Sequence, residues 1–105
     1  MKKDNPNGTK TQAQDATAKP KVDLSASQRK GAEERALEAS ANAAKVSAAT
    51  KDEHQHADLI RAAAKQAERY ADDAMVAGSV ADAQYASRKA IEAAAAAGWL
   101  YGQRA

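Results

Sequence analysis

Residues 74–83 have the sequence AMVAGSVADA, and this short stretch decides the expected fold. Gly78 suits the position just after a helix, and Ser79 with Asp82 forms the hydroxyl–carboxylate pattern that begins the next one. Long alanine-rich segments lie on both sides of this turn. Because so short a connection makes successive helices run in opposite directions, the sequence predicts an antiparallel helical hairpin over residues 50–98.

The two helices of the hairpin have predicted ends and predicted buried faces. The first begins at Thr50, whose hydroxyl and the carboxylate of Glu53 have capping-box spacing, and it ends near Ala77. The second runs from Val80 to about Ala97, with Gly98 as its stop. The first helix has an apolar stripe made of Ile60, Ala63, Ala67, Tyr70, Ala71 and Ala74, with Leu59, Met75 and Val76 beside it. The second has Val80, Ala83, Ala86 or Ser87, Ala90 and Ala94 along one side, widened by Tyr85 and Ile91.

The segments outside the hairpin differ from it in composition. Residues 26–49 form a further alanine-rich helix, with or without contact to the hairpin; Leu37, Ala41, Ala44 and Ala48 share one of its faces. Residues 1–25 are polar and basic and are expected to form a disordered arm, and residues 99–105 form an aromatic C-terminal tail. The expected fold class is therefore all-α: an alanine-rich antiparallel hairpin, with a third helix left open, after a disordered basic N-terminal arm.

Alanine dominates the apolar part of the chain. It supplies 30 of the 105 residues, whereas there is one Trp, there are three Tyr, and Phe and Cys are absent. Alanine has the highest helix propensity of any residue but buries little apolar area. Helices should therefore form readily around a thin core, and we expect them to need a partner.

The composition also argues against several classes of protein. Without cysteine there is no disulfide scaffold and no thiolate metal site, and no apolar run is long enough for a membrane span or a signal peptide, so a cytoplasmic protein is expected. The sequence has no nucleophile elbow and no phosphate-binding glycine loop, which favours a protein that is not an enzyme and binds no cofactor or small-molecule substrate. His54 and Asp58 share a helix face at i,i+4, but two ligands are too few for a specific metal site.

The expected function is assembly with another protein or with further copies of the chain. The protein is interpreted as a homo-oligomer or as a small structural or inhibitory subunit docked on a larger protein. Trp99 either folds back over Ile91 or Val80 or anchors the chain in another subunit, since Trp and Tyr are favoured at binding hot spots. The predicted contact residues are Leu59, Ile60, Ala67, Tyr70, Ala74, Val80, Ile91, Trp99, Leu100 and Tyr101.

Two alternatives belong to other classes of protein. A nucleic-acid-binding protein would place its basic arm along phosphates, and the residues predicted for this role are Lys10, Lys19, Lys21, Arg29 and Lys30. A mostly unfolded protectant chain would also be rich in Ala, Lys, Glu and Gln, but the predicted helix ends argue against it.

Overall fold

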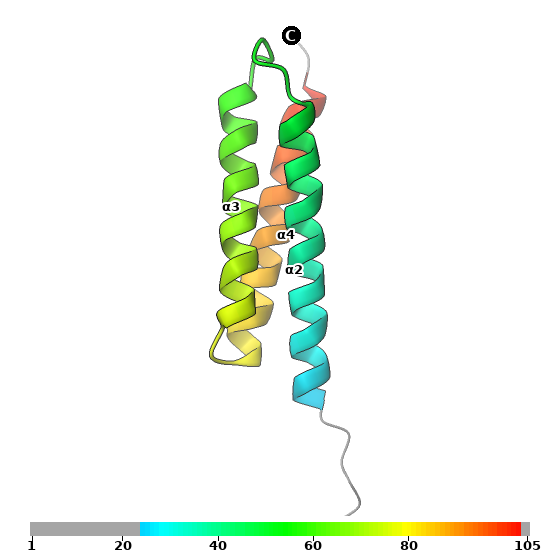
Figure 1. Ribbon diagram of the computed structural model, residues 1–105, viewed down its shortest axis with the longest axis vertical. Coiled ribbons are helices and arrows are strands. Elements are labelled where there is room, and N and C mark those ends of the chain that lie inside the picture. The colour runs from blue at the N-terminus through cyan, green and yellow to red at the C-terminus, as the bar shows by residue number, and fades with distance from the viewer. Residues whose placement is uncertain (1–23, 104–105) are drawn as a thin grey trace, which may run out of the picture.

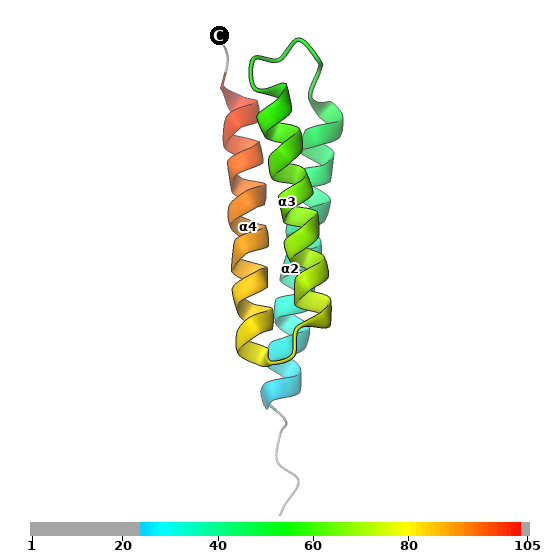
Figure 2. The ribbon, with the colours of Figure 1, turned by 90° about the vertical axis from the view of Figure 1, so that its left-hand side faces the viewer.

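The computed structural model describes residues 24–103, and within this range the protein consists of three helices and no strand. Helix α2 spans Leu24–Ala49, α3 spans Ala57–Val76 and α4 spans Val80–Gly102. Figures 1 and 2 show the three helices side by side, running up, down and up, so that α3 and α4 form the expected antiparallel hairpin. Helix α2 packs against both of them, which makes the fold an up-down-up three-helix bundle. The predicted all-α fold class is confirmed, and the expected disordered arm lies almost entirely outside the described residues.

The interior of the bundle is made of alanine. Of the fourteen buried apolar residues, thirteen are alanine, and Ile60 is the one large side chain among them. All three helices contribute to a larger cluster made of Ala36, Ala39, Ala71, Ala74, Ala86 and Ala90, and a smaller cluster contains Ala43, Ala67 and Ala93. Methyl groups facing one another let the helices approach closely, so packing depends on short distances between backbones rather than on large side chains.

The two helices of the hairpin bury most of the predicted stripes. In α3 the residues Ile60, Ala67, Ala71 and Ala74 are buried, as expected, together with Ala57. In α4 the buried residues are Ala83, Ala86, Ser87, Ala90, Ala93 and Ala97. Tyr85 and Ile91 instead lie on the surface, because the helical repeat turns them away from the face of α4 that carries Ala83, Ala90 and Ala97.

The buried face of α2 differs from the predicted one. The predicted face, from Leu37 to Ala48, is exposed, and the helix instead buries Ala32, Ala36, Ala39 and Ala43. Alanine lies on every side of this helix, so its spacing gives no single apolar face. The face that packs is selected by the fit against α3 and α4, and the prediction was wrong for this reason.

The capping box predicted at Thr50 and Glu53 is not formed in the connection between α2 and α3. Helix α3 begins at Ala57 after His56 as its N-cap residue, without a side-chain cap, so Thr50 does not begin it. The Thr50 hydroxyl instead donates to the Val46 carbonyl at 2.7 Å and satisfies the last turn of α2. Arg61 of α3 holds the connection through Asp52, with Nη2 2.6 Å from Oδ1.

The connection between α3 and α4 contains the predicted cap. The Ser79 hydroxyl accepts a hydrogen bond from the Asp82 backbone N–H at 3.1 Å, which confirms the start of α4. Helix α3 ends at Val76, and its C-cap residue Ala77 is extended. Gly78 is not left-handed, so the glycine-specific stop is not used here. The Arg29 guanidinium of α2 donates to the Ala77 carbonyl and ties the start of the bundle to this turn.

Helix α4 does not stop at Gly98. It continues to Gly102, so Trp99, Leu100 and Tyr101 belong to its last turns rather than to a separate tail. A glycine inside a helix costs about 1 kcal/mol relative to alanine. The five alanines of residues 93–97 favour helix, and Ala93 and Ala97 pack inside the bundle, which offsets that cost.

Enlarging one core alanine should destabilise the bundle. Ala90 is fully buried, so we expect Ala90→Leu to lower the free energy of unfolding by about 1–3 kcal/mol through overpacking. The control is Ala62→Leu on the exposed side of α3, which should change it by less than about 0.5 kcal/mol. Urea unfolding followed by circular dichroism, at one protein concentration, measures both. Equal stabilities of the two variants would contradict the close packing of alanine described above.

Removing the Ser79 cap should also have a measurable cost. Ser79→Ala leaves the Asp82 N–H without its side-chain acceptor, and we expect a loss of about 1 kcal/mol in unfolding free energy. Ser27→Ala, at an exposed position of α2, is the matched control and should not destabilise the chain. Thermal melts of the two variants test the difference, and an unchanged melt of Ser79→Ala would show that the cap contributes nothing.

Candidate interaction surface

The large apolar side chains of this protein lie mainly on its outside. Leu24, Leu37, Leu59, Met75, Val76, Tyr85, Ile91, Trp99 and Tyr101 are all exposed. Val76 has 79 % and Trp99 has 66 % of its surface accessible. Isolated exposed apolar residues are ordinary in proteins, but here the bulky residues are outside while the core holds methyl groups.

The structure separates the ten predicted contact residues into three groups. Ile60, Ala67 and Ala74 lie in the core and face no outside partner in the folded bundle. Tyr70, Val80 and Leu100 are half-buried. Leu59, Ile91, Trp99 and Tyr101 are exposed and available for contact.

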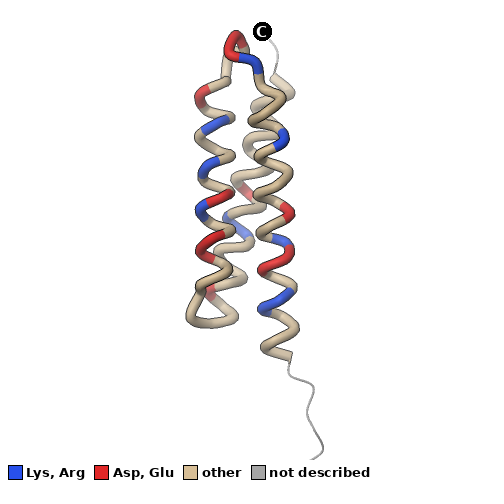
Figure 3. The backbone as a smooth tube through the Cα atoms, viewed as in Figure 1, with Lys and Arg blue, Asp and Glu red and all other residues tan. Residues whose placement is uncertain are grey.

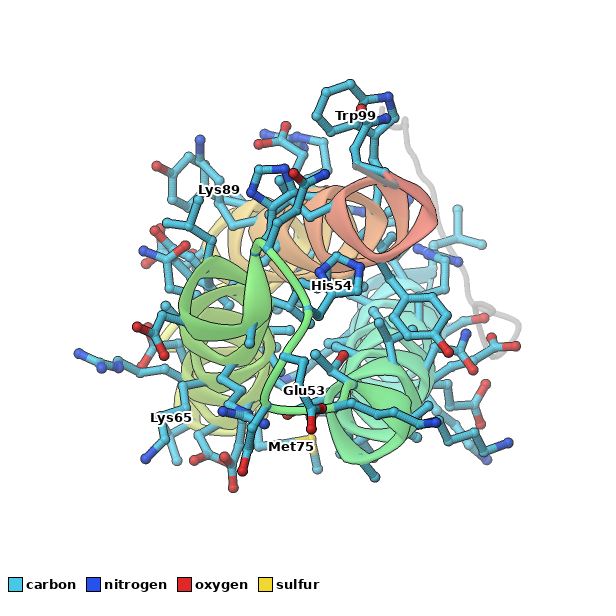
Figure 4. All side chains as sticks on the ribbon, turned by 90° about the horizontal axis from the view of Figure 1, so that it is seen from above. Glu53, His54, Lys65, Met75, Lys89 and Trp99 are labelled. Carbon is cyan, nitrogen blue, oxygen red and sulfur yellow. The ribbon has the colours of Figure 1, made fainter. Side chains whose placement is uncertain are left out.

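Trp99 does not cover the hairpin. It extends from the side of α4 that faces away from α2 and α3 (Figure 4), and it lies in a continuous helix with Val80 and Ile91. The interpretation of Trp99 as a side chain folded back over these residues is therefore wrong, because the helix keeps it at least two turns away.

A second stripe runs along this outer side of α4, and sequence analysis missed it. Its members are Ala81, Tyr85, Arg88, Glu92, Ala95 and Trp99, and every one is exposed. We call it the outer α4 stripe. Its spacings of four and three alternate without interruption, which is the signal that could have revealed it.

Charged groups along the outer α4 stripe already interact within the chain. The Lys89 ammonium lies 3.4 Å from the Glu92 carboxylate, and that carboxylate raises the pKa of Lys89 above its usual 10.5. Arg88 and Lys89 both lie near the face of the Tyr85 ring, at 5.9 and 5.6 Å from its centroid. The stripe therefore carries charge of both signs.

His54 joins the α2–α3 connection to the end of α4. Its Nε2 lies 3.0 Å from the Tyr101 carbonyl oxygen, and its Nδ1 accepts the His56 backbone N–H at 3.0 Å. Because Nδ1 accepts, Nε2 carries the hydrogen and donates to a carbonyl that the helix end leaves without a partner. The His54 ring also stacks on Tyr101, with centroids 5.8 Å apart.

This end of the bundle is polar and shallow. Figure 4 looks down on it and shows His54 above the middle of the bundle. A hollow of about 390 Å³ beside it is lined by Ala49, Lys51, Glu53, His54 and Tyr101. His54 precedes α3, so it does not share a helix face with Asp58, and within residues 24–103 no three His, Asp or Glu side chains gather into a group that would hold a metal.

The described helices carry no excess of positive charge. Ten Lys and Arg against eleven Asp and Glu in residues 24–103 give a net charge of −1, and Figure 3 shows both signs distributed along the helices. Of the residues predicted for nucleic-acid binding, Arg29 pairs with Glu33 at 3.6 Å, and Lys30 is exposed. Lys10, Lys19 and Lys21 lie outside the described residues.

In the part of the chain from 24 to 103, no helix combines the length and apolar character needed to cross a membrane. Comparison with protein-family models, curated proteins and solved structures gives no match.

The His54 contact should stabilise the end of the bundle. We expect His54→Ala to lower the unfolding free energy by about 0.5–1.5 kcal/mol, since it removes a hydrogen bond and a stacked ring from the last turn of α4. Gln55→Ala, at the neighbouring exposed position, should have almost no effect. Hydrogen exchange of the α4 amides provides a second measurement, and unchanged protection near Tyr101 in His54→Ala would contradict the contact.

Proposed function

We propose that this protein is a non-catalytic helical interaction module that assembles by placing its exposed large apolar side chains against another helical surface. The observation that carries the proposal is the position of Trp99, which lies on the outer side of α4 and is 66 % exposed. The core of the same bundle is almost wholly alanine. A tryptophan left in water at the end of a rigid helix is the kind of side chain that supplies most of the free energy of binding in protein interfaces.

The thin core supports the same proposal. Alanine buries a single methyl group, worth about 0.8 kcal/mol, whereas a large aliphatic side chain contributes about 1.5–3 kcal/mol when buried. Thirteen alanines and one isoleucine therefore supply little hydrophobic stabilisation for three helices. Covering the exposed large side chains by a partner would add the apolar burial that the isolated bundle lacks.

The balance of charge favours a protein partner over nucleic acid for the helical part of the chain. With a net charge of −1, the helices do not create the positive field that phosphate binding requires. Both signs of charge on α3 and α4 instead suit a polar rim around an apolar contact. The partner is then a further copy of the chain or a larger protein.

Site-specific photo-crosslinking in the cells that produce the protein tests this function. We expect a photoreactive phenylalanine in place of Trp99 to yield a covalent adduct with a protein, because position 99 lies at the proposed contact. The same substitution at Arg69, exposed on α3, is the matched control and should yield little adduct. An absence of protein adducts at position 99, or equal adducts at both positions, would contradict the proposed function.

A further inference from the structure

Helix α4 has two opposite faces with different contents. Ala83, Ala90 and Ala97 recur every seven residues, have no accessible surface and pack inside the bundle. The outer α4 stripe lies on the other side of the helix, directly away from these alanines. Helix α4 therefore uses one seven-residue repeat to hold the monomer together and leaves a second one open to solvent.

The spacing of the outer α4 stripe is that of a coiled-coil seam. From Ala81 to Trp99 its members follow at intervals of four, three, four, three and four residues, which averages close to the 3.5 residues of a heptad position. Eighteen residues of helix separate the two ends, or about 27 Å. This is long enough for a two-helix contact of several turns.

When two copies of the stripe run antiparallel, the residues of one copy are complementary in charge and size to those of the other. In an antiparallel pair of α4 helices with Arg88 opposite Glu92 of the second copy, Tyr85 comes opposite Ala95 and Trp99 comes opposite Ala81. Each of the six layers then joins opposite charges or a large side chain and a small one. A large side chain opposite a small one allows two helices to pack closely, and the opposite charges at the centre can form ion pairs between the copies.

A parallel pair of the same stripes has the opposite character. Each residue then meets its own copy, so that Arg88 faces Arg88 and Glu92 faces Glu92, and two tryptophans compete for the same space. Like charges placed directly opposite one another are destabilising in a helical interface. The sequence of the stripe therefore selects the antiparallel arrangement.

The residues flanking the stripe are compatible with this arrangement. Ile91, with 42 % of its surface exposed, lies beside the stripe close to the two-fold axis, where it meets Ile91 of the second copy. Lys89 flanks the other side, where the same symmetry brings it near Lys89 of the second copy, and each ammonium is paired with Glu92 of its own chain, which offsets the like charge. One flank therefore adds apolar burial and the other holds its charge in an existing ion pair.

From these observations we infer that two copies of the protein pair antiparallel through the outer α4 stripe, with Arg88 of each copy on Glu92 of the other and Trp99 of each on Ala81 of the other. This inference rests on the proposed interaction function and identifies the partner as a second copy of the chain. The contact is isologous, so it closes as a dimer of bundles and leaves α2 and α3 outside the interface.

Charge reversal at the centre of the stripe tests the pairing. We expect the full chain to form dimers in sedimentation equilibrium, and Arg88→Glu or Glu92→Arg to raise the dimer dissociation constant at least about tenfold, since each creates two like-charge contacts across the axis. The double variant Arg88→Glu with Glu92→Arg restores opposite charges and should regain the wild-type constant. Trp99 emission should shift to shorter wavelength as the dimer forms.

Arg69→Glu is the matched control for these reversals. Arg88→Glu places a like charge at i,i+4 from Glu92 of its own chain, and Arg69→Glu does the same with Asp73 on the exposed side of α3. The Arg69→Glu variant should leave the dimer dissociation constant unchanged. Circular dichroism of each variant checks that the helices remain folded. If the single reversals and the double variant dimerise alike, the dimer uses another surface and the inference is overturned.

Disulfide trapping tests the direction and the register. The chain has no cysteine, so Tyr85→Cys and Ala95→Cys each introduce the only thiol. Under oxidation we expect a mixture of the two variants to form the cross-linked dimer and each alone to form little, because two copies of position 85 lie about 15 Å apart in the antiparallel pair. A disulfide needs Cα atoms within about 7 Å. Efficient cross-linking of either variant by itself would overturn the arrangement.

The inference and the proposed function fail separately. A wild-type chain that stays monomeric up to about 1 mM overturns self-pairing. If position 99 then still cross-links to a different protein in cells, the interaction function stands with another partner. If it cross-links to nothing, both proposals fail.

Discussion

Contact between alanine methyl groups is the constraint on which the rest of this bundle depends. Helices that meet through alanine pack near the lower end of the usual range of interaxial distance, about 8 Å. At that spacing there is no interior volume for leucine, tyrosine or tryptophan. Within residues 24–103, Ile60 is the one large side chain that is fully buried, and the other large apolar residues are half-buried or exposed.

Polar contacts at the two ends of the bundle add to the stability that its small apolar core supplies. At one end Arg29 reaches the Ala77 carbonyl, and Ser79 caps α4. At the other end Arg61 holds the α2–α3 connection, and His54 bonds to the last turn of α4. Two of these contacts, Arg29 to Ala77 and His54 to Tyr101, join residues far apart in the chain. They help to keep the helices in register although the alanine faces themselves are nearly uniform and would tolerate sliding.

The same uniformity limited what could be predicted from the sequence. The hairpin was predictable because Ser79 and Asp82 form a local cap and because the α3 stripe contains Ile60 among alanines. The packed face of α2 was not predictable, since alanine occurs around the whole helix and the competing faces differ little in transfer free energy. For the candidate site, exposure at Leu59, Ile91, Trp99 and Tyr101 agrees with a contact role, whereas three of the ten predicted residues lie in the core.

The sequence by itself determined that the chain forms helices, where α4 begins, and that the hairpin buries alanine. These features depend on helix propensity and on groups within four residues of one another. Only the tertiary structure decided that Thr50 closes α2 rather than opens α3, that α4 continues through Gly98, and which side of each helix faces water. Such choices depend on which backbones come close together. The free energy gained by packing the helices together exceeds the small local preference of a threonine for a helix N-cap or of a glycine for a helix end.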